Sequence, residues 1–68
     1  MEIQVVINGE TQSIPDGETV LALLHRLNLD PARVAVELDR RIVKQPTWSE
    51  TNIQAGATIE IVQFVGGG

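Results

Sequence analysis

The stretch that decides the fold is TIEIVQFV, residues 58–65, which runs directly into three glycines at residues 66–68. Its β-branched and aromatic residues are typical of a strand, which we expect to be the last strand of the domain. The glycines lack a β-carbon, so they form a thin, flexible tip. The sequence therefore predicts a folded domain over residues 1–65 and a flexible tail over residues 66–68, whose one functional group is the carboxylate of Gly68.

A glycine run at a terminus also has simpler explanations. It could be a frayed end, the stub of a cut linker or a cloning scar. Linkers usually mix glycine with serine or other polar residues, whereas this run follows the strand with no polar transition. We interpret the domain as a base that presents the terminal carboxylate to other proteins, and the simpler explanations stay open as alternatives.

Composition limits the classes of function. The chain has 68 residues, enough for one domain with a thin core and little room for an internal cleft, which argues against a self-sufficient enzyme. Nine acidic and five basic residues give a net charge of −4, and the only aromatic residues are Trp48 and Phe64. Nucleic-acid-binding proteins normally show a basic footprint and stacking aromatics, so this class is excluded. A mild acidic balance suits docking to a basic protein surface.

Cysteine is absent, which removes disulfides, thiolate nucleophiles and thiolate metal sites. One histidine with scattered carboxylates does not make a metal cluster, so we expect no bound metal or cofactor. No apolar run approaches the ~20 residues of a membrane span, and no basic-then-apolar leader opens the chain. We therefore expect a cytoplasmic protein that is monomeric when free.

The first half of the chain predicts a hairpin and then a helix. Residues 2–8 alternate apolar and polar side chains, as in a half-buried strand, and Asn8-Gly9 is a strong two-residue hairpin signal. Residues 10–14 return as a polar strand, which we place at a sheet edge. A turn at residues 15–17 then leads to the helix.

The helix is expected over residues 20–28, with Thr19 as its N-cap. Asn28 can end it in the left-handed conformation, and we expect His25 to lie in solvent. The apolar stripe, spaced as on one helix face, consists of Val20, Leu23, Leu24 and Leu27.

The second half predicts short elements. Residues 34–38 and 41–44 form two short strands joined by a turn at Asp39-Arg40. Residues 46–51 are irregular with at most one helical turn, and Trp48 points into the core or its rim. Residues 54–57 form the turn before the last strand.

This order indicates a small α+β domain with one main helix on one face of a mixed sheet of four to five strands. It fits a β-grasp arrangement, with the first and last strands side by side in the centre. One helix covers only one sheet face, and we assign it to Ile59 and Ile61 because the opposite face of the last strand begins with Glu60. Val62 and Phe64 then point away from it, next to Val6, and these three are predicted to form a partner-docking patch. The alternative is that loops cover them or that they are scattered exposed hydrophobic residues.

The chain resembles the ubiquitin-like sulfur carriers, and among them most the sulfur carrier proteins of thiamin biosynthesis. The likeness covers nearly the whole chain, and the strand running into terminal glycines is its most specific part. It rests on four pieces: TVxxLL from Thr19, VAVE from Val34, the pair Ile42-Val43 followed by Trp48, and IEIVQFVGGG from Ile59.

The resemblance implies that an ubiquitin-activating-like adenylyltransferase, using ATP and magnesium, adenylates the carboxylate of Gly68. Sulfur from a persulfide donor enzyme then replaces the AMP and leaves a thiocarboxylate, which thiazole synthase consumes. Gly66 and Gly67 would thread the partner's active site, where a β-carbon would collide. The chain itself would bind no cofactor and act as a carrier rather than an enzyme.

Other functions of such a tail stay open. The chain could be the small subunit of molybdopterin synthase, a protein modifier joined through Gly68 to lysines, or a regulatory or RNA-associated domain cut from a longer protein. Three positions depart from the family pattern, Asp39, the pair Lys44-Gln45 and Ala57, and all are expected in turns or on the surface. They bear on partner contacts rather than on the tail chemistry.

Overall fold

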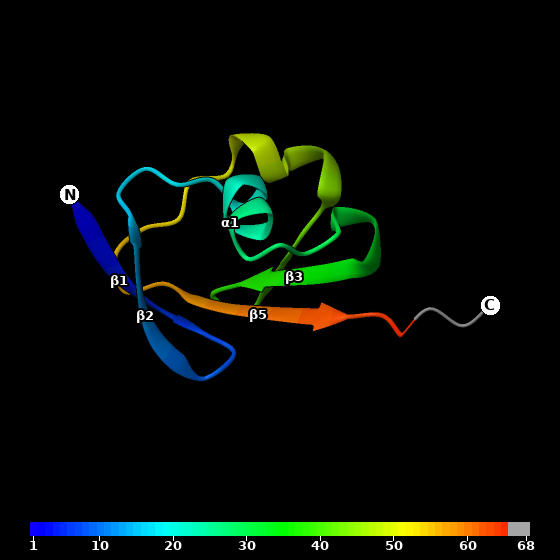
Figure 1. Ribbon diagram of the computed structural model, residues 1–68, viewed down its shortest axis with the longest axis horizontal. Coiled ribbons are helices and arrows are strands. Elements are labelled where there is room, and N and C mark those ends of the chain that lie inside the picture. The colour runs from blue at the N-terminus through cyan, green and yellow to red at the C-terminus, as the bar shows by residue number, and fades with distance from the viewer. Residues whose placement is uncertain (66–68) are drawn as a thin grey trace.

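The computed structural model describes residues 1–65, and the predictions made for residues 66–68 lie outside this part. Within residues 1–65, five strands form one sheet in the order β2-β1-β5-β3-β4, with a single α-helix on one face (Figure 1). The elements are β1 Glu2–Ile7, β2 Glu10–Pro15, α1 Val20–Arg26, β3 Val34–Leu38, β4 Arg41–Val43 and β5 Thr58–Gln63, with 3₁₀ helices η1 Pro31–Arg33 and η2 Gln45–Glu50.

The last strand lies in the middle of the sheet, as predicted. β5 runs parallel to β1 on one side and antiparallel to β3 on the other. β2 pairs with β1 at one edge and β4 pairs with β3 at the other. The sheet is therefore mixed, and the α+β β-grasp arrangement expected from the sequence is confirmed.

Both hairpin turns use residues in the left-handed backbone region. Asn8 and Gly9 have φ values of 49° and 84°, and Asp39 and Arg40 have φ values of 51° and 71°. Positive φ at both central residues is the signature of the type I′ turn, whose twist matches that of the flanking strands. The first turn follows the Asn-Gly signal, whereas the second places an arginine in a conformation that L-residues adopt at a cost.

The helix begins where the sequence predicts. The hydroxyl oxygen of Thr19 accepts a hydrogen bond of 3.1 Å from the amide of Ala22, which satisfies one of the free amides of the first turn.

The helix ends at Arg26, two residues before the predicted end. Asn28 has a φ of 61°, its amide donates to the carbonyl of His25, and the amide of Leu29 donates to the carbonyl of Leu24. This pair of bonds is a Schellman motif, in which the left-handed residue stands just outside the helix. Asn28 is thus the left-handed terminator, as expected.

An ion pair ties the end of the helix to the loop before it. Nε and Nη2 of Arg26 donate to the two carboxylate oxygens of Glu18, each at 2.9 Å, and the Glu18 side chain is nearly buried. The hydrogen bonds that Arg26 donates to the Glu18 carboxylate raise the pKa of Arg26 above its ordinary value. This two-point contact fixes the helix against the β2–α1 connection.

The core lies between the sheet and the helix. Trp48 is 3% exposed, and its indole N–H donates to the carbonyl of Val43 at 2.8 Å, so it belongs to the core. Ala57, which was expected in a turn or on the surface, is also buried, because it lies directly before β5 beside β1, where its carbonyl accepts from the amide of Val6 at 2.9 Å. The buried apolar residues are Val5, Ile7, Ile14, Val20, Leu23, Leu24, Val34, Val36, Trp48, Ile53, Ala57 and Ile59.

β5 ends at Gln63 rather than at Val65. The amide of Phe64 still donates to the carbonyl of Arg33 at 2.7 Å, but β3 begins only at Val34, so the neighbouring strand offers no continued ladder. Beyond Gln63 the chain leaves the sheet in the direction of the C-terminus (Figure 1). Within residues 1–65, no helix is long and apolar enough to cross a membrane.

Leu24 and His25 are neighbours on the helix with opposite environments, which gives a matched test of the core. Leu24 is fully buried and His25 is exposed. We expect Leu24→Ala to lower the free energy of unfolding by roughly 2–5 kcal/mol, because it removes transfer energy and leaves a cavity. His25→Ala should change it by less than about 0.5 kcal/mol. Chemical denaturation of both variants checks this, and equal losses would contradict the assignment of the core.

Candidate functional site

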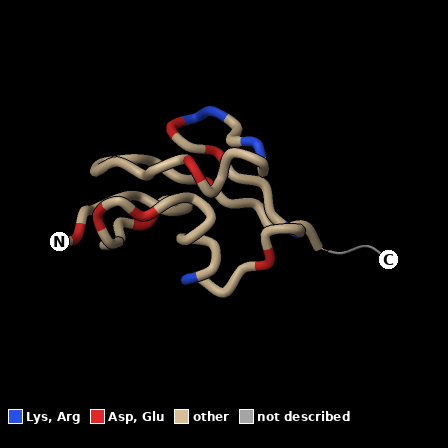
Figure 2. The backbone as a smooth tube through the Cα atoms, turned by 90° about the horizontal axis from the view of Figure 1, so that it is seen from above, with Lys and Arg blue, Asp and Glu red and all other residues tan. Residues whose placement is uncertain are grey.

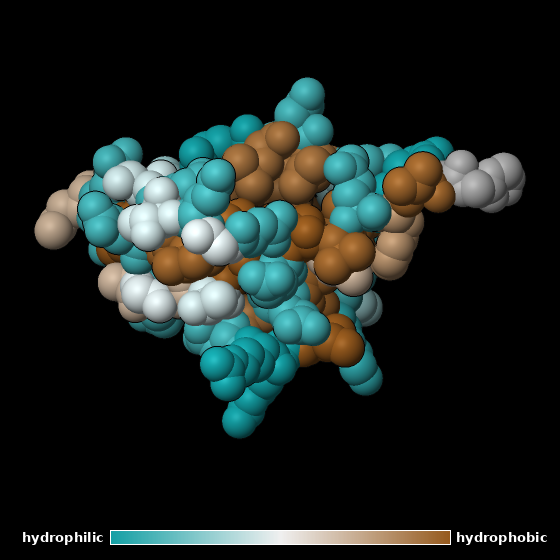
Figure 3. Space-filling view, turned by 90° about the horizontal axis from the view of Figure 1, so that it is seen from below, coloured by the Kyte–Doolittle hydropathy of each residue, from teal (hydrophilic) through white to brown (hydrophobic). Residues whose placement is uncertain are grey.

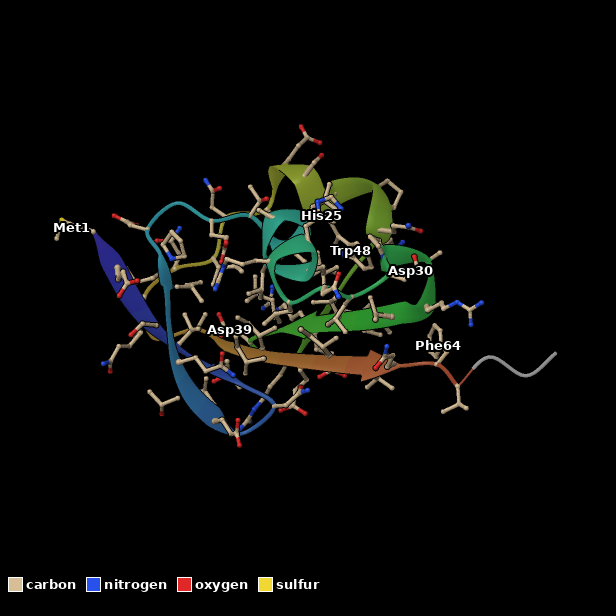
Figure 4. The ribbon with its side chains drawn as sticks, in the orientation of Figure 1. Met1, His25, Asp30, Asp39, Trp48 and Phe64 are labelled. Atoms are coloured by element: carbon tan, nitrogen blue, oxygen red, sulfur yellow. The ribbon has the colours of Figure 1, made fainter. Side chains whose placement is uncertain are left out.

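The site is organised by β5, because this strand leads to the C-terminal residues. Its start is held by Asp39, which lies beside it in the β3–β4 turn (Figure 4). The amide of Asp39 donates to the carbonyl of Thr58 at 2.7 Å, and the Asp39 carboxylate accepts from the amide of Thr58 at 2.9 Å. Asp39 thus gives Thr58 the two hydrogen bonds that a residue of a neighbouring strand would give, one through its backbone amide and one through its side chain.

Asn8 holds the other side of β5 in the same way. β1 pairs with β5 only at Val6–Thr58 and Ile7–Ile59. Beyond this point the side chain of Asn8 accepts from the amide of Ile61 at 2.7 Å and donates to its carbonyl at 3.2 Å. A side-chain amide therefore extends the parallel ladder past the end of β1.

The sequence predicts turns at Asn8 and Asp39 but not their contacts with β5. Asn and Asp side chains readily mimic a backbone donor or acceptor near a turn. The presence of Asn and Asp in the turns was therefore a signal for such contacts. Which strand their side chains contact depends on the order of the strands in the sheet.

The two faces of β5 differ as predicted at the positions inside the strand. Ile59 is fully buried beneath the helix, whereas Val62 is 59% exposed on the opposite face, which we call the open face. Phe64 is 54% exposed and lies beyond the last residue of β5 (Figure 4). Because it lies outside the strand, strand alternation does not determine its face.

The prediction that Val6 lies next to Val62 and Phe64 in one patch is wrong. In the register of the sheet Val6 lies opposite Thr58, four residues before Val62. At a rise of ~3.3 Å per residue this separates them by roughly 13 Å along the strand. Val6 is also only partly exposed. The residue that does lie opposite Val62 is Ala35 of β3.

A pocket lies on the helix side, next to the end of β1. Its volume is about 250 Å³, below the ~300–1,000 Å³ typical of small-molecule sites. The lining residues are Ile7, Asn8, Glu10, Gln12, Leu27, Leu29, Ile61 and Gln63. Among residues 1–65, no group of three His, Asp or Glu side chains is placed to hold a metal ion.

The role of Asn8 can be separated from its turn conformation. Asn8→Gly keeps a residue that adopts positive φ and removes both side-chain hydrogen bonds to β5. We expect the free energy of unfolding to fall by roughly 1–2 kcal/mol, since each bond contributes about 1 kcal/mol.

Arg40→Gly is the matched control, because Arg40 has positive φ in the equivalent turn. Its side chain takes part in none of the hydrogen bonds or ion pairs found within residues 1–65. This variant should be neutral or more stable by up to about 1 kcal/mol. Denaturation curves that show the same change for both variants would rule out a specific contribution of Asn8.

The chain is similar to a known protein family and to several known proteins. The family model of ThiS matches residues 4–68. The thiazole synthase of Paramagnetospirillum magneticum is 39% identical over 66 residues, which are 97% of this chain but 20% of that protein. The chain thus spans about a fifth of the length of the thiazole synthases that it matches.

Two further relatives can be aligned with this chain over their full length. The sulfur carrier protein ThiS of Escherichia coli is 29% identical over 66 residues, 97% of this chain and 100% of that protein. A crystal structure of the thiamine biosynthesis protein ThiS from Geobacter metallireducens superposes with a TM-score of 0.84 at 25% identity, over 97% of this chain and 100% of that one. The chain belongs to the ThiS family of sulfur carrier proteins.

Proposed function

We propose that this carrier is adenylated on the carboxylate of Gly68 and converted to a thiocarboxylate that supplies the sulfur for thiazole formation in thiamin biosynthesis. The observation that carries the proposal is the family match, which extends to residue 68 and so includes the three glycines. The path of β5 supports it, because the strand is held at the centre of the sheet and directs the chain outward at its C-terminal end (Figure 1).

The chemistry explains why a partner and ATP are required. A terminal carboxylate has a reference pKa of about 3.3–3.7, so it is ionised at neutral pH and is a poor acyl donor. Attack of its oxygen on the α-phosphorus of ATP, with magnesium held by the partner, releases pyrophosphate and forms an acyl-adenylate. The developing charge must be stabilised by the adenylyltransferase. We expect this reaction in the cytoplasm.

Sulfur then replaces the AMP in two steps. The terminal sulfur of a persulfide on the donor enzyme attacks the acyl carbon, and AMP leaves. The resulting acyl disulfide is reduced by a thiol, which forms a disulfide with the donor and releases the thiocarboxylate. The carrier contains no cysteine, so it has no thiol of its own to attack this end.

Thiazole synthase is the proposed acceptor of the sulfur. The support is that two proteins named thiazole synthase contain a segment 39% and 35% identical to nearly the whole of this chain. We propose that Gly66 and Gly67 pass through a narrow channel in each partner, where a side chain would collide. Val62 and Phe64 are the proposed apolar anchors for docking.

The intact mass of the protein isolated from its own cells tests the function directly. Replacement of one terminal oxygen by sulfur is the expected result. Isopeptide-linked adducts on other proteins would instead indicate a protein modifier. The molybdopterin pathway would be indicated if the thiocarboxylate were lost in cells blocked in molybdenum cofactor synthesis but not in thiamin synthesis.

Deleting Gly67 and Gly68 should abolish adenylation without affecting folding. The last strand ends at Gln63, so we expect the free energy of unfolding to change by no more than about 0.5 kcal/mol. ATP–pyrophosphate exchange with the adenylyltransferase should fall to background. Gly67→Ala keeps the carboxylate and should give partial exchange. Full exchange by the truncated protein would refute a role for the C-terminal carboxylate.

Phe64→Ala should affect binding more than folding. Its side chain is about half exposed, so its loss should cost less stability than Leu24→Ala. A buried aromatic anchor at an interface contributes ~2 kcal/mol or more, and we expect a loss of this size in binding to both the adenylyltransferase and thiazole synthase. Calorimetric titration measures it. Normal binding by a variant that unfolds easily would show that Phe64 serves the core.

A further inference from the structure

The two sides of β5 are held differently near its end. On one side, β3 pairs with the strand as far as Gln63, and the amide of Phe64 donates to the carbonyl of Arg33 at 2.7 Å. Because hydrogen-bonded positions alternate along an antiparallel ladder, the bond at Phe64 implies that Val62 also faces β3, whereas the amide and carbonyl of Ile61 face the β1 side. Ile61 therefore depends on the β1 side for its partners.

On the β1 side, the contact with Ile61 comes from a side chain. β1 ends at Ile7, and the amide of Asn8 donates to the carbonyl of Ile59 at 2.8 Å. The chain then turns into β2, and the side chain of Asn8 makes the two bonds to Ile61, at 2.7 and 3.2 Å. The pocket described above lies next to this contact, lined in part by Asn8, Ile61 and Gln63. Among the hydrogen bonds found within residues 1–65, those of the Asn8 side chain are thus the last on this side of β5.

Neither charge nor packing holds the segment that follows. Residues 61–65 carry no charged side chain (Figure 2), so their side chains form no ion pair. In the space-filling view from below, the molecule narrows toward its C-terminal end, and hydrophobic side chains stand exposed there (Figure 3). Phe64 and Val65 are 54% and 96% exposed. The hydrogen bonds at Ile61 and Phe64 therefore fix the position from which the chain continues toward Gly68.

We propose that Asn8 is a positioning residue for the reaction at Gly68, because it holds Ile61 and so fixes where the C-terminal residues leave the sheet. This inference rests on the proposed function and adds to it a residue that acts through β5 rather than at the reacting group. A carboxylate that follows a fixed strand end reaches the partner's active site more often than one that follows a strand end separated from the sheet.

The length of chain beyond the last held residue sets the size of the effect. Gly68 lies four residues after Phe64 and eight residues after Glu60. If loss of the Asn8 contacts lets the end of β5 separate from β3 as far as Glu60, this length doubles. The effective concentration of a tethered group falls roughly as the −3/2 power of the tether length, which for a doubling is about threefold.

ATP–pyrophosphate exchange with the adenylyltransferase, measured at varied concentrations of the full-length carrier, tests the inference. Asn8→Gly keeps a residue that adopts positive φ and removes both side-chain bonds to Ile61. We expect kcat/KM for the carrier to fall about threefold, because the strand end must be ordered again each time the carboxylate is delivered.

Amide hydrogen exchange of the free carrier, followed by NMR, shows whether the effect passes through β5. The amide of Phe64 is bonded to Arg33, on the side of the strand opposite to Asn8. In Asn8→Gly this amide should exchange its hydrogen several-fold faster than in the unmodified carrier, because the strand end opens more often. A residue that acted only by touching the adenylyltransferase would leave the Phe64 amide unchanged.

Two further variants separate positioning from lost stability. Ile14→Val removes one buried methyl group in β2, opposite Ile3 and away from the turn at Asn8. It should lower the melting temperature by several degrees, as Asn8→Gly does, but leave both kcat/KM and the Phe64 amide unchanged. Asn8→Asp also tolerates positive φ and keeps an acceptor for the amide of Ile61, so its kcat/KM should lie between those of Asn8→Gly and the unmodified carrier.

The outcomes distinguish this inference from the proposed function. If the unmodified carrier supports ATP–pyrophosphate exchange and Asn8→Gly has the same kcat/KM, the inference is refuted and the proposed function stands. An equal loss in Ile14→Val would refute it in favour of general stability, and an unchanged Phe64 amide in Asn8→Gly would refute it in favour of a direct contact. If the unmodified carrier supports no ATP–pyrophosphate exchange, the proposed function fails and the inference fails with it.

Discussion

The pairing of β5 between β1 and β3 is the constraint on which the rest of the domain depends. A strand that arrives last in the chain occupies the centre of the sheet, so the two earlier hairpins are joined only through it. Ile59, in the middle of this arrangement, is fully buried against the helix. The sheet is therefore complete only when the segment before the C-terminal glycines is in place. This makes the part of the chain nearest the proposed reaction also one of the best anchored.

The short ladders of β5 explain why two turn residues matter. β1 contributes only two paired positions, and β3 pairs with β5 only from Ile59 to Gln63, so Thr58 has no partner in β3. Asn8 and Asp39 extend these ladders with side-chain atoms, one on each side of the strand. Both can do so because they stand in left-handed turns that bring a short polar side chain close to the adjacent strand. The same residues therefore serve the hairpin and the central strand.

The two faces of the sheet differ in burial. The helix covers one face and supplies Leu23 and Leu24 to the core, while the other face carries exposed glutamates beside Val62 and Ile42. A carrier needs no cleft of its own, because its proposed reactive group is at the chain end and the active sites belong to its partners. A small domain with a thin core is sufficient for this role.

The sequence by itself determined the local features of this protein. The Asn8-Gly9 turn, the Thr19 cap, the left-handed terminator Asn28 and the strand character of residues 58–63 each follow from interactions within a few residues, so pattern and propensity predict them. The exposure of Val62 also followed, since alternation along a strand needs only the knowledge of which face the helix covers.

Only the tertiary structure decided the contacts between distant segments. The register of β1 against β5 separated Val6 from Val62, and the register of β3 against β5 brought Glu37 opposite Glu60. Neither follows from the pattern, because sliding one strand by two residues keeps the same side chains on the same face. The burial of Ala57 and the contacts of Asn8 and Asp39 with β5 depend in the same way on the order of the strands. Alternation can be read along a single segment, whereas register is a property of two segments and of the core that holds them together.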